Sequence, residues 1–247
     1  MLARFVFSKL QNYESYWHVR KQFTVQTGII GYLSYLLSMG KQDPFKISIS
    51  TSSGLIQYAD LRPNYKTSAS NGTTELGNNE LVPFRLTPNM SHFIGTAGIK
   101  GVLPASMMAL SNALKENESF LEDYLHLYFN DDMQAFERKQ NKHRHTSIND
   151  TASVGSTNLD TDGNEQALSE SFRLKKSASQ NVNVVLNRIN KTVPVSMPPK
   201  YDRSTCMTSG RPLNEGAKIN DNIRLMIDSA MDPKLLSQMP PNWQSWL

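Results

Sequence analysis

The C-terminal run at residues 237–247 constrains this chain more than any other feature, because it carries Trp243 and Trp246. A buried tryptophan removes roughly 150–250 Å² of surface from water. Terminal residues, by contrast, usually fray unless they dock on something. The sequence therefore predicts that this end of the chain is a docking element.

The residues before this run predict a helix, a turn and a second, short helix. Apolar residues recur at helical spacing within residues 217–230. Asp232 followed by Pro233 is typical of an N-cap with proline at the first helical position. The chain is thus expected to end as a helix, a turn, a short helix and an aromatic plug.

This ending resembles the FATC domain, the C-terminal element of the phosphatidylinositol 3-kinase-related protein kinases. That domain has the same helix, an Asp-Pro turn and a terminal run with leucine, methionine and two aromatic residues. The positions that match this pattern are Asp232, Pro233, Leu236, Met239, Trp243 and Trp246. A terminal amphipathic helix that only packs on its own domain fits the pattern too, so both interpretations stay open.

Length and composition allow one or two compact units. The chain has 247 residues, of which 38% are apolar, and this is enough to build a core. The formal net charge of +4 is small, so a solvated surface explains it better than a nucleic-acid partner does. Cys206 is the single cysteine, which excludes an internal disulfide and a cysteine-built zinc site. No signal-like segment and no run of about eighteen apolar residues is present, so we expect a soluble, intracellular protein.

Residues 1–137 carry most of the apolar periodicity and should form the main folded unit. Residues 14–39 are apolar around much of the helical circumference, which predicts a central buried helix. Apolar runs on either side of Ser53-Gly54 predict a short β-hairpin. The expected elements, in chain order, are a helix at 14–39, strands at 46–50 and 55–59, a mobile loop at 66–80, and helices at 104–114 and 118–136, the last with Asn117 as its N-cap.

The remainder of the chain divides into three parts. Residues 138–183 contain a single Phe, Tyr or Trp side chain and are dominated by Ser, Thr, Asn, Asp and Lys, so they are expected to be a disordered insertion. Residues 184–214 begin with an apolar run and become proline-rich, which is typical of the end of a folded lobe followed by a linker. Residues 215–247 are the FATC-like end.

Two further segments have the order and spacing of the catalytic centre in the same kinase family. Residues 40–46 stand where the family has Gly-Asp-Arg-His-Pro-Ser-Asn, and residues 57–62 stand where it has His-Ile-Asp-Phe-Gly. The framework positions that remain are Gly40, Pro44, Gly54 and Asp60. Arg-Lys-Gln-Phe at 20–23 and Val-Pro-Phe-Arg-Leu-Thr at 82–87 match the family in the same order. The resemblance implies an α+β, mostly α-helical fold: the C-lobe of a protein or lipid kinase with a small β-hairpin and a helical FATC end.

The residues that would carry the family's chemistry are replaced. Phosphoryl transfer needs an aspartate at the attacking hydroxyl, and an asparagine and a second aspartate at magnesium. Lys41 stands in place of the first aspartate, and a lysine cannot accept a proton at neutral pH. Lys46 stands in place of the asparagine, where its charge would repel the metal. The other replacements are Gln42 for arginine, Asp43 for histidine and Leu61-Arg62 for Phe-Gly.

Asp60 is the family's metal ligand that remains in these two segments, and we expect it to form salt bridges with the two lysines. One carboxylate beside two lysines does not suit magnesium. The sequence therefore predicts a pseudokinase without catalytic residues, without a cofactor site and without a metal site.

Within the family, the chain resembles the TRRAP-type transcription coactivator scaffolds. The segments that carry this resemblance are 83–89, 98–101, 105–107 and the ending at 241–247. It implies a non-catalytic scaffold segment of histone acetyltransferase (SAGA-like) complexes, which acts in the nucleus in transcription regulation and chromatin modification. The implied partners are the other protein subunits and the remainder of a large polypeptide, without a membrane. No kinase N-lobe is found, so we expect a fragment, a misassigned start or a separately encoded piece.

Other functions stay open. One is a divergent active kinase whose N-lobe lies on sequence outside this chain. Another is weak nucleic-acid contact through the basic stretch at 138–144. His143 and His145 lie among cations, Cys206 has no histidine nearby, and residues 95–101 lack the phosphate-binding spacing, so these positions predict no metal site, nucleophile or phosphate cradle.

Overall fold

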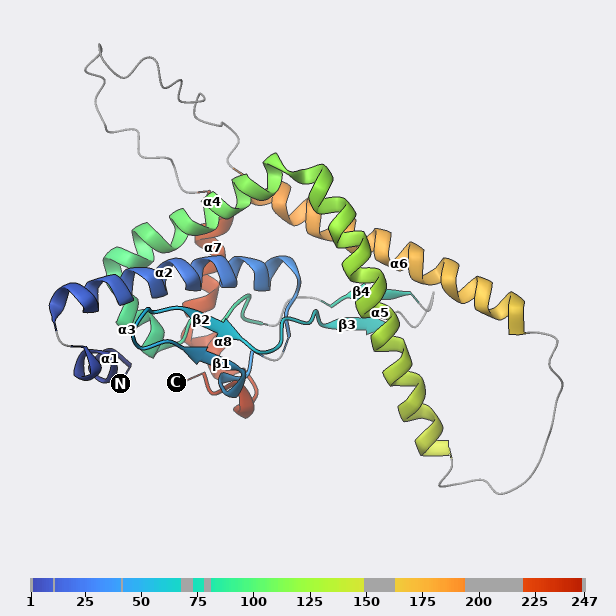
Figure 1. Cartoon of the computed structure of the whole chain (residues 1–247), viewed down its shortest axis with the longest axis horizontal. Coiled ribbons are helices and arrows are strands. Elements are labelled where there is room, and N and C mark those ends of the chain that lie inside the picture. The colour runs from blue at the N-terminus through green and yellow to red at the C-terminus, as the bar shows by residue number, and fades with distance from the viewer. Residues whose placement is uncertain are drawn as a thin grey trace, which may run out of the picture.

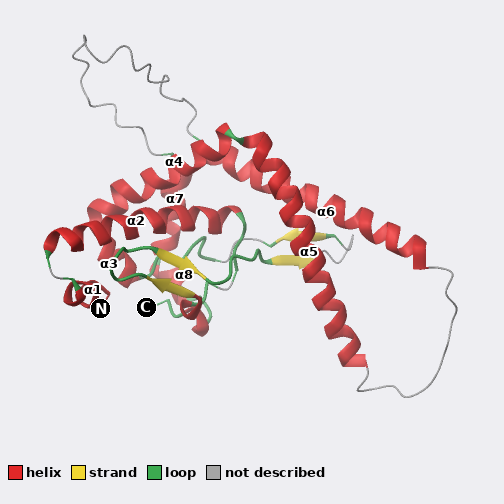
Figure 2. Cartoon of the chain, in the orientation of Figure 1, coloured by secondary structure: helices red, strands yellow, loops and turns green. Residues whose placement is uncertain are grey.

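The computed structural model describes residues 2–10, 12–40, 42–67, 73–77, 81–148, 163–193 and 220–245. The elements are α1 (Leu2–Lys9), α2 (Tyr13–Leu36), η1 (Pro44–Lys46), β1 (Ile47–Ile49), β2 (Ile56–Tyr58), β3 (Tyr65–Thr67), β4 (Thr74–Leu76), α3 (Pro88–Ala97), η2 (Gly98–Val102), α4 (Leu103–Glu116), α5 (Glu118–Ile148), α6 (Gly163–Thr192), α7 (Asp221–Met231), α8 (Pro233–Ser237) and η4 (Pro241–Trp243). Figures 1 and 2 show a mostly helical chain with two small two-stranded sheets, so the predicted fold class is confirmed.

The long helix α2 lies at the centre of the fold. Asn12 caps it, because the Asn12 Oδ1 atom accepts a hydrogen bond from the Ser15 amide at 2.8 Å. Tyr32 on this helix is fully buried. Gly31 lets the helix approach its neighbour closely, since a Cβ atom there would lie 2.6 Å from the Phe84 ring. The predicted buried helix at 14–39 is confirmed apart from its last turn.

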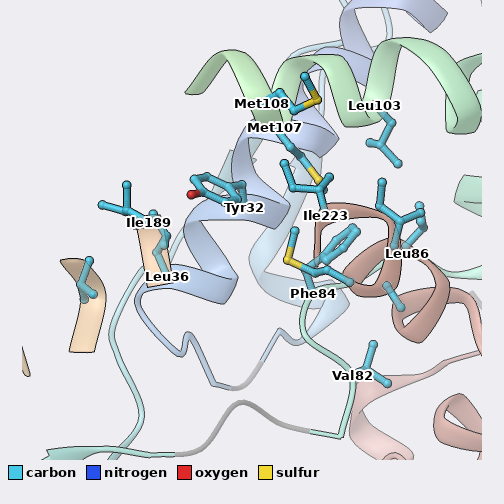
Figure 3. Packing of buried hydrophobic residues seen from close by; sticks show 14 of the residues in the cluster. Tyr32, Leu36, Val82, Phe84, Leu86, Leu103, Met107, Met108, Ile189 and Ile223 are labelled. Carbon is cyan, nitrogen blue, oxygen red and sulfur yellow. The ribbon is translucent and has the colours of Figure 1, made fainter. Parts of the chain in front are cut away.

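The core joins helix faces that are distant in the sequence. Figure 3 shows side chains of α2, α4, α6, α7 and the segment 81–87 meeting in one apolar cluster. Three hydroxyls also lie in this core: the Tyr32 Oη atom is 2.5 Å from Thr192 Oγ1, which is 3.1 Å from Ser111 Oγ. Because each hydroxyl has a partner, this polar cluster is compatible with burial.

The first hairpin is confirmed. β1 and β2 pair antiparallel in the register Ile47 with Tyr58, Ser48 with Gln57 and Ile49 with Ile56. Gly54 in the turn has φ of +75°, and a Cβ atom there would lie 2.3 Å from the Val19 carbonyl oxygen. The turn therefore requires glycine both for its backbone conformation and for its approach to α2.

A second hairpin replaces part of the mobile loop expected at 66–80. β3 and β4 pair antiparallel, and α6 holds them. The Leu76 amide donates to Asn181 Oδ1 at 2.8 Å, Asn181 Nδ2 donates to the Thr74 carbonyl at 3.2 Å, and the Thr74 amide donates to Ser177 Oγ at 3.2 Å. The loop prediction was wrong for the described part of this segment because its partners come from a distant helix that local composition does not reveal. Residues 68–72 and 78–80 lie outside the described part.

The disordered insertion expected at 138–183 is also wrong for the residues described there. α5 continues to residue 148, and α6 begins at residue 163. On α6, Ala178, Val182, Val185 and Ile189 are buried at helical spacing. A narrow apolar stripe on a polar helix is enough to pack it against a neighbour, so low average hydrophobicity misled the prediction. Residues 149–162 lie outside the described residues.

Residues 88–116 form a helical stretch that is broken at Gly95. Gly95 has φ of +73°, and the Arg20 Nη2 atom donates to the Ile94 carbonyl at 2.8 Å, which satisfies an acceptor freed by the break. By length and composition alone Pro88–Glu116 could cross a membrane, with a mean hydropathy of 1.4 in its most apolar window, 33% of which is buried. Leu103 and Met107 on this stretch are fully buried in the core, and core helices pass the same test.

Asn117 does not have the predicted N-cap role. It lies between α4 and α5 as expected, but its Nδ2 atom donates to the Ala113 carbonyl at 2.9 Å. The side chain thus closes the end of α4, because it finds an unpaired carbonyl in the preceding turn. The helix predicted at 118–136 is confirmed as the first part of α5.

The C-terminal elements follow the predicted order. Asn220 caps α7 by accepting from the Asn222 amide at 2.8 Å. Asp232 caps α8 by accepting from the Lys234 amide at 2.9 Å, with Pro233 in the first turn. The helix expected at 217–230 is confirmed from residue 221, and the Asp-Pro turn is confirmed.

Candidate functional site

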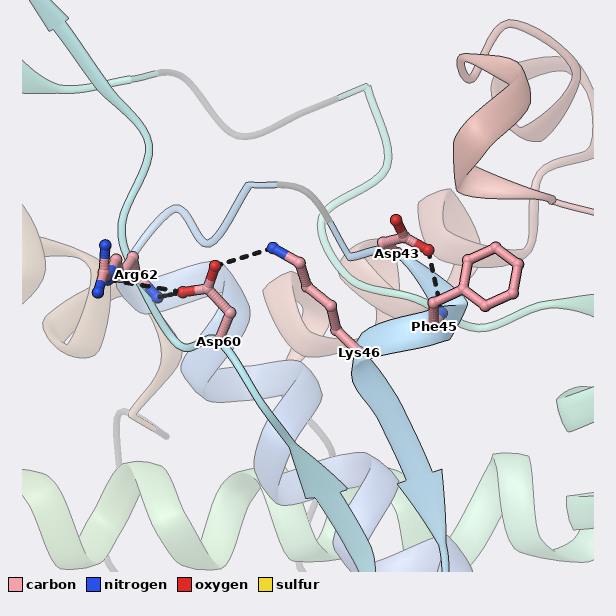
Figure 4. Close-up of polar contacts among 5 residues, drawn as sticks. All are labelled: Asp43, Phe45, Lys46, Asp60 and Arg62. Atoms are coloured by element: carbon pink, nitrogen blue, oxygen red, sulfur yellow. Dashed lines mark hydrogen bonds and ion pairs between the residues drawn. The ribbon is translucent and has the colours of Figure 1, made fainter.

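The two substituted segments meet at one end of the first hairpin. η1 brings Lys46 to the start of β1, and Asp60 follows β2. The Ala59 amide donates to the Lys46 carbonyl at 2.9 Å, so the hairpin register holds the two side chains at the same edge. The Lys46 Nζ atom lies 2.9 Å from Asp60 Oδ2 (Figure 4). The predicted salt bridge is confirmed for Lys46, whereas Lys41 lies outside the described residues.

A second cation lies beside the other carboxylate oxygen. Asp60 Oδ1 accepts from the Arg62 amide at 3.3 Å and lies 3.8 Å from Arg62 Nε. The hydrogen bond from Lys46 is the main cause that lowers the pKa of the Asp60 carboxyl below its usual value, and the charges of Lys46 and Arg62 act in the same direction. The carboxylate therefore stays ionised at neutral pH, and the Lys46 ammonium group is paired with it.

A polar pocket of about 530 Å³ opens beside this ion pair. Its lining residues are Lys46, Ala59, Asp60, Leu61, Arg62, Tyr128 and Asp132. The Tyr128 hydroxyl donates to the Leu61 carbonyl at 3.3 Å, so α5 supplies one wall. Burial raises the pKa of Tyr128 to about 12, and this phenol is neutral at physiological pH. The pocket thus combines two cations with two carboxylates, and this balanced charge favours neither magnesium nor a phosphate group.

The carboxylate of Asp43, in the degenerate loop at residues 40–46, has a structural role. The Asp43 Oδ1 atom accepts from the Phe45 amide at 3.0 Å and caps η1 (Figure 4). In the part of the chain that the structure describes, no group of three His, Cys, Asp or Glu side chains could hold a metal ion. The side chains of His143 and His145, and Cys206, lie outside the described part, so the predictions about them stay predictions.

The C-terminal plug docks on the same region through Trp243. This side chain is only 3% exposed, and the Arg85 guanidinium lies over its ring, with 4.7 Å between Arg85 Cζ and the ring centroid. Arg85 Nη1 donates to the Trp243 carbonyl, and Nη2 donates to the Gln244 carbonyl at 3.1 Å. Gln244 has φ of +47°, and in this left-handed conformation its carbonyl accepts the hydrogen bond from the Arg85 guanidinium. Trp246 lies outside the described residues.

Gln42 connects this plug to the degenerate loop. Its Oε1 atom accepts from the Arg85 amide at 2.7 Å, and its carbonyl accepts from Arg85 Nη1 at 3.4 Å. Both side chains are buried, at 4% and 5% exposure. Arg85 therefore connects Trp243 to this loop, because it binds both Gln42 and the Trp243 carbonyl.

Sequence reasoning did not find the roles of Gln42 and Arg85. The only available signal was an arginine inside the apolar run at 82–86, because a buried guanidinium must have hydrogen-bond partners. Burial lowers the pKa of Arg85, while Tyr58 and Asp43 oppose that shift. The partners themselves, two backbone carbonyls near the C-terminus and one in the loop, cannot be read from side-chain identity.

A family model described as phosphatidylinositol 3- and 4-kinase matches residues 1–138, more than half of the chain. The chain belongs to this family. The matched range contains both degenerate segments, 40–46 and 57–62, so the kinase-like framework inferred from the sequence is confirmed.

Two relatives agree with the TRRAP-type resemblance. The SAGA complex/NuA4 acetyltransferase complex subunit Tra1 of Schizosaccharomyces pombe is 32% identical over 142 residues, which cover 58% of this chain and 4% of that protein. The transformation/transcription domain-associated protein of Mus musculus is 31% identical over 139 residues, which cover 56% of this chain and 5% of that protein. The chain is thus similar to TRRAP and Tra1, and the matched part is about a twentieth of their length.

A solved structure supports the fold. The FAT and kinase domain of CtTel1 superposes with a TM-score of 0.58 over 100% of this chain and 14% of its own, at 17% sequence identity. This likeness shows a kinase-like fold of the phosphatidylinositol 3-kinase-related type. It extends over the whole chain, whereas the family model ends at residue 138.

Proposed function

We propose that this chain is a pseudokinase C-lobe with a FATC end, and that it acts as a non-catalytic scaffold segment. The observation that carries this proposal is the bond between Lys46 and Asp60. Asp60 is the acidic group that a kinase of this family would use for magnesium, and here an ammonium group of the same chain neutralises it. Because this ammonium group belongs to the same chain, it competes with magnesium for Asp60 at every magnesium concentration. This competition supports the proposal that the metal site is lost.

The rest of the loop supports the same proposal. Phosphoryl transfer relies almost entirely on positioned charges around the phosphates and the metal. Lys41 replaces the aspartate, Asp43 caps a turn, and Arg62 adds a further cation beside Asp60. We infer that the loop keeps its fold and has lost the charges that the reaction needs.

The scaffold role rests on the relatives and on the plug. The names of the relatives describe a SAGA and NuA4 acetyltransferase complex subunit and a transcription domain-associated protein. We infer that this chain belongs to a large polypeptide of that kind, joins other subunits of histone acetyltransferase complexes in the nucleus, and acts in transcription regulation through chromatin modification. Within it we assign residues 1–137 and 184–214 to the C-lobe and its linker, and residues 215–247 to the FATC domain. We propose no membrane partner and only weak nucleic-acid contact.

A divergent active kinase is the second candidate, because Asp60 remains at the position of a metal ligand. Two variants of the full polypeptide that contains this chain separate the candidates. Asp60→Asn removes the carboxylate, and Trp243→Ala removes the plug. A scaffold predicts that Asp60→Asn co-purifies with acetyltransferase subunits as the parent does, while Trp243→Ala loses them.

The same variants can contradict the proposal. If Asp60→Asn abolishes a phosphotransfer activity that the parent has, the chain is an active kinase. If Trp243→Ala assembles normally while its fold is intact by circular dichroism, the FATC end has no scaffold role. Trp17→Ala is the matched control, because Trp17 is 55% exposed and lies on α2 outside the plug.

A further inference from the structure

The first hairpin presents a strongly apolar face to a cavity. In the register of β1 and β2, Ile47 lies opposite Tyr58 and Ile49 lies opposite Ile56, so these four side chains share one face of the sheet. All four are only partly buried, although they face the lobe. Ser48 and Gln57 are exposed on the opposite face. An apolar sheet face normally packs against a neighbouring element. Here Ile49 and Ile56 contact the core, and all four residues also border an open space.

That space is a cavity of about 530 Å³. Leu2 and Phe5 of α1, Phe23 of α2 and Met90 of α3 complete its apolar walls. It is distinct from the polar pocket beside Asp60, since the two share no lining residue. Its volume falls within the range of about 300–1,000 Å³ that is common for small-molecule sites, and such sites are mostly apolar with a few polar groups.

The charged side chain that lines this cavity is basic, whereas the Asp43 carboxylate, beside the lining residue Pro44, caps η1 through the Phe45 amide and acts electrostatically on Arg85. Arg85 lines it, and no Asp or Glu side chain is among the lining residues. Arg85 makes its hydrogen bonds with carbonyl oxygens, and no carboxylate of the described residues lies within ion-pair distance of it. At α1, the Lys9 Nζ atom lies 5.9 Å from the centroid of the Phe5 ring, which lines the cavity, and Lys9 itself is exposed. A ligand therefore meets apolar walls inside and a positive charge at the α1 side.

We propose that this cavity binds an anionic amphiphile with a single hydrocarbon chain, such as a long-chain carboxylate. The chain lies between the inner face of β1–β2 and the residues of α1, α2 and α3, and the acidic head lies at the α1 end beside Lys9. Burial of the methylene groups supplies the affinity, and the cations select the charge of the head. The site is independent of the metal and nucleotide chemistry that the degenerate loop has lost.

A series of ligands that differ only in the head group tests the charge. The complete 247-residue chain is titrated by calorimetry with dodecanoate, dodecanol and dodecylammonium below their micelle concentrations. We expect saturable one-to-one binding of dodecanoate, at least about tenfold weaker binding of dodecanol, and no saturable binding of dodecylammonium. Equal binding of all three, or no binding of dodecanoate, would overturn the proposal.

Neighbouring residues on the same strand locate the site. Ile49→Trp fills the cavity, whereas Ser48→Trp places the same side chain on the opposite face. We expect Ile49→Trp to weaken dodecanoate binding by at least about tenfold and Ser48→Trp to leave it unchanged. Ile56→Trp fills the same cavity from the partner strand and replaces Ile49→Trp if that variant does not fold, as judged by circular dichroism. Equal effects at positions 48 and 49 would contradict the assignment.

Lys9→Glu tests the head-group end without touching the cavity walls. It should weaken dodecanoate by about tenfold and leave dodecanol unchanged, and an equal effect on both ligands would refute the placement of the head. Sedimentation with vesicles of phosphatidylcholine and phosphatidylserine distinguishes a free amphiphile from a membrane lipid. Vesicle binding that Ile49→Trp abolishes would identify a membrane lipid as the source of the chain. Vesicle binding that survives Ile49→Trp, together with no dodecanoate binding, would show that a surface other than this cavity is responsible.

Discussion

Truncation of the buried plug should cost several kcal/mol of stability. Trp243 is 3% exposed. A buried tryptophan covers roughly 150–250 Å², so at about 25 cal/mol per Å² its burial contributes roughly 4–6 kcal/mol as an upper bound. The Arg85 guanidinium over the ring adds about 1–2 kcal/mol. Alanine retains Cβ and the carbonyl that Arg85 binds, so we expect Trp243→Ala to lower the free energy of unfolding by about 3–5 kcal/mol.

Urea denaturation of the complete chain, followed by far-ultraviolet circular dichroism, measures this difference directly. Trp17→Ala is the matched control, because this tryptophan is 55% exposed. Its ring centroid lies 5.1 Å from Lys21 Nζ and 5.3 Å from the centroid of the His18 ring. We expect the control to lose less than about 1 kcal/mol. If the two variants unfold at the same urea concentration, Trp243 does not hold the C-terminus to the lobe and the plug assignment is wrong.

The ion pair, the second hairpin and α6 give three further predictions. Lys46→Met should raise the pKa of the Asp60 carboxyl, which carbon-detected NMR measures. In the parent, the ion pair stabilises the fold above the usual carboxyl pKa, and this stability is lost as the pH falls through the lowered pKa of Asp60. The variant should therefore lose less stability on acidification, and the difference should be at most about 1 kcal/mol because the pair is partly exposed. Asn181→Leu removes the partner of the Leu76 amide and of the Thr74 carbonyl. It should lower the free energy of unfolding by about 2–3 kcal/mol and speed hydrogen exchange at the Leu76 amide. Asn183→Leu, on the exposed side of α6, should have neither effect. Deletion of residues 139–181 should lower the melting temperature by more than about 5 °C, since it removes Ser177, Ala178 and Asn181 from the packed face of α6. An unchanged melting temperature would instead support the disordered insertion expected from the sequence.

The parts of the fold that the sequence predicted are those with local signals. The α2 helix is marked by dense apolar periodicity, the β1–β2 hairpin by two apolar runs around Gly54, and α8 by Asp232 and Pro233. Each of these signals acts within a few residues of the structure that it specifies. For that reason the sequence predicted that these elements exist, whereas the residues at which they begin and end differ from the prediction.

The errors concern elements whose stability comes from distant partners. β3 and β4 have a polar, loop-like composition, and their hydrogen bonds with Ser177 and Asn181 depend on α6. α6 in turn is polar on most of its surface, and four residues at helical spacing carry its packing. Average composition could not reveal either, because each becomes favourable only when the other is present.

The candidate site divides in the same way. The Lys46–Asp60 bond could be predicted, because both residues stand at recognisable positions of a known motif and a hairpin brings them together. The link from Gln42 through Arg85 to the Trp243 carbonyl could not, because two of its three acceptor groups are backbone atoms. A motif indicates which side chains matter for chemistry but does not report which backbone groups hold the loop.

The central claim is that the ammonium group of Lys46 occupies the charge position that magnesium would need. The most direct measurement is a calorimetric titration of ATP, with and without magnesium, into the full polypeptide that contains this chain, with Asp60→Asn as the matched variant. The account predicts no magnesium-dependent binding to the parent and an unchanged background in Asp60→Asn. A saturable, magnesium-requiring isotherm for the parent at micromolar ATP, lost in Asp60→Asn, would contradict it.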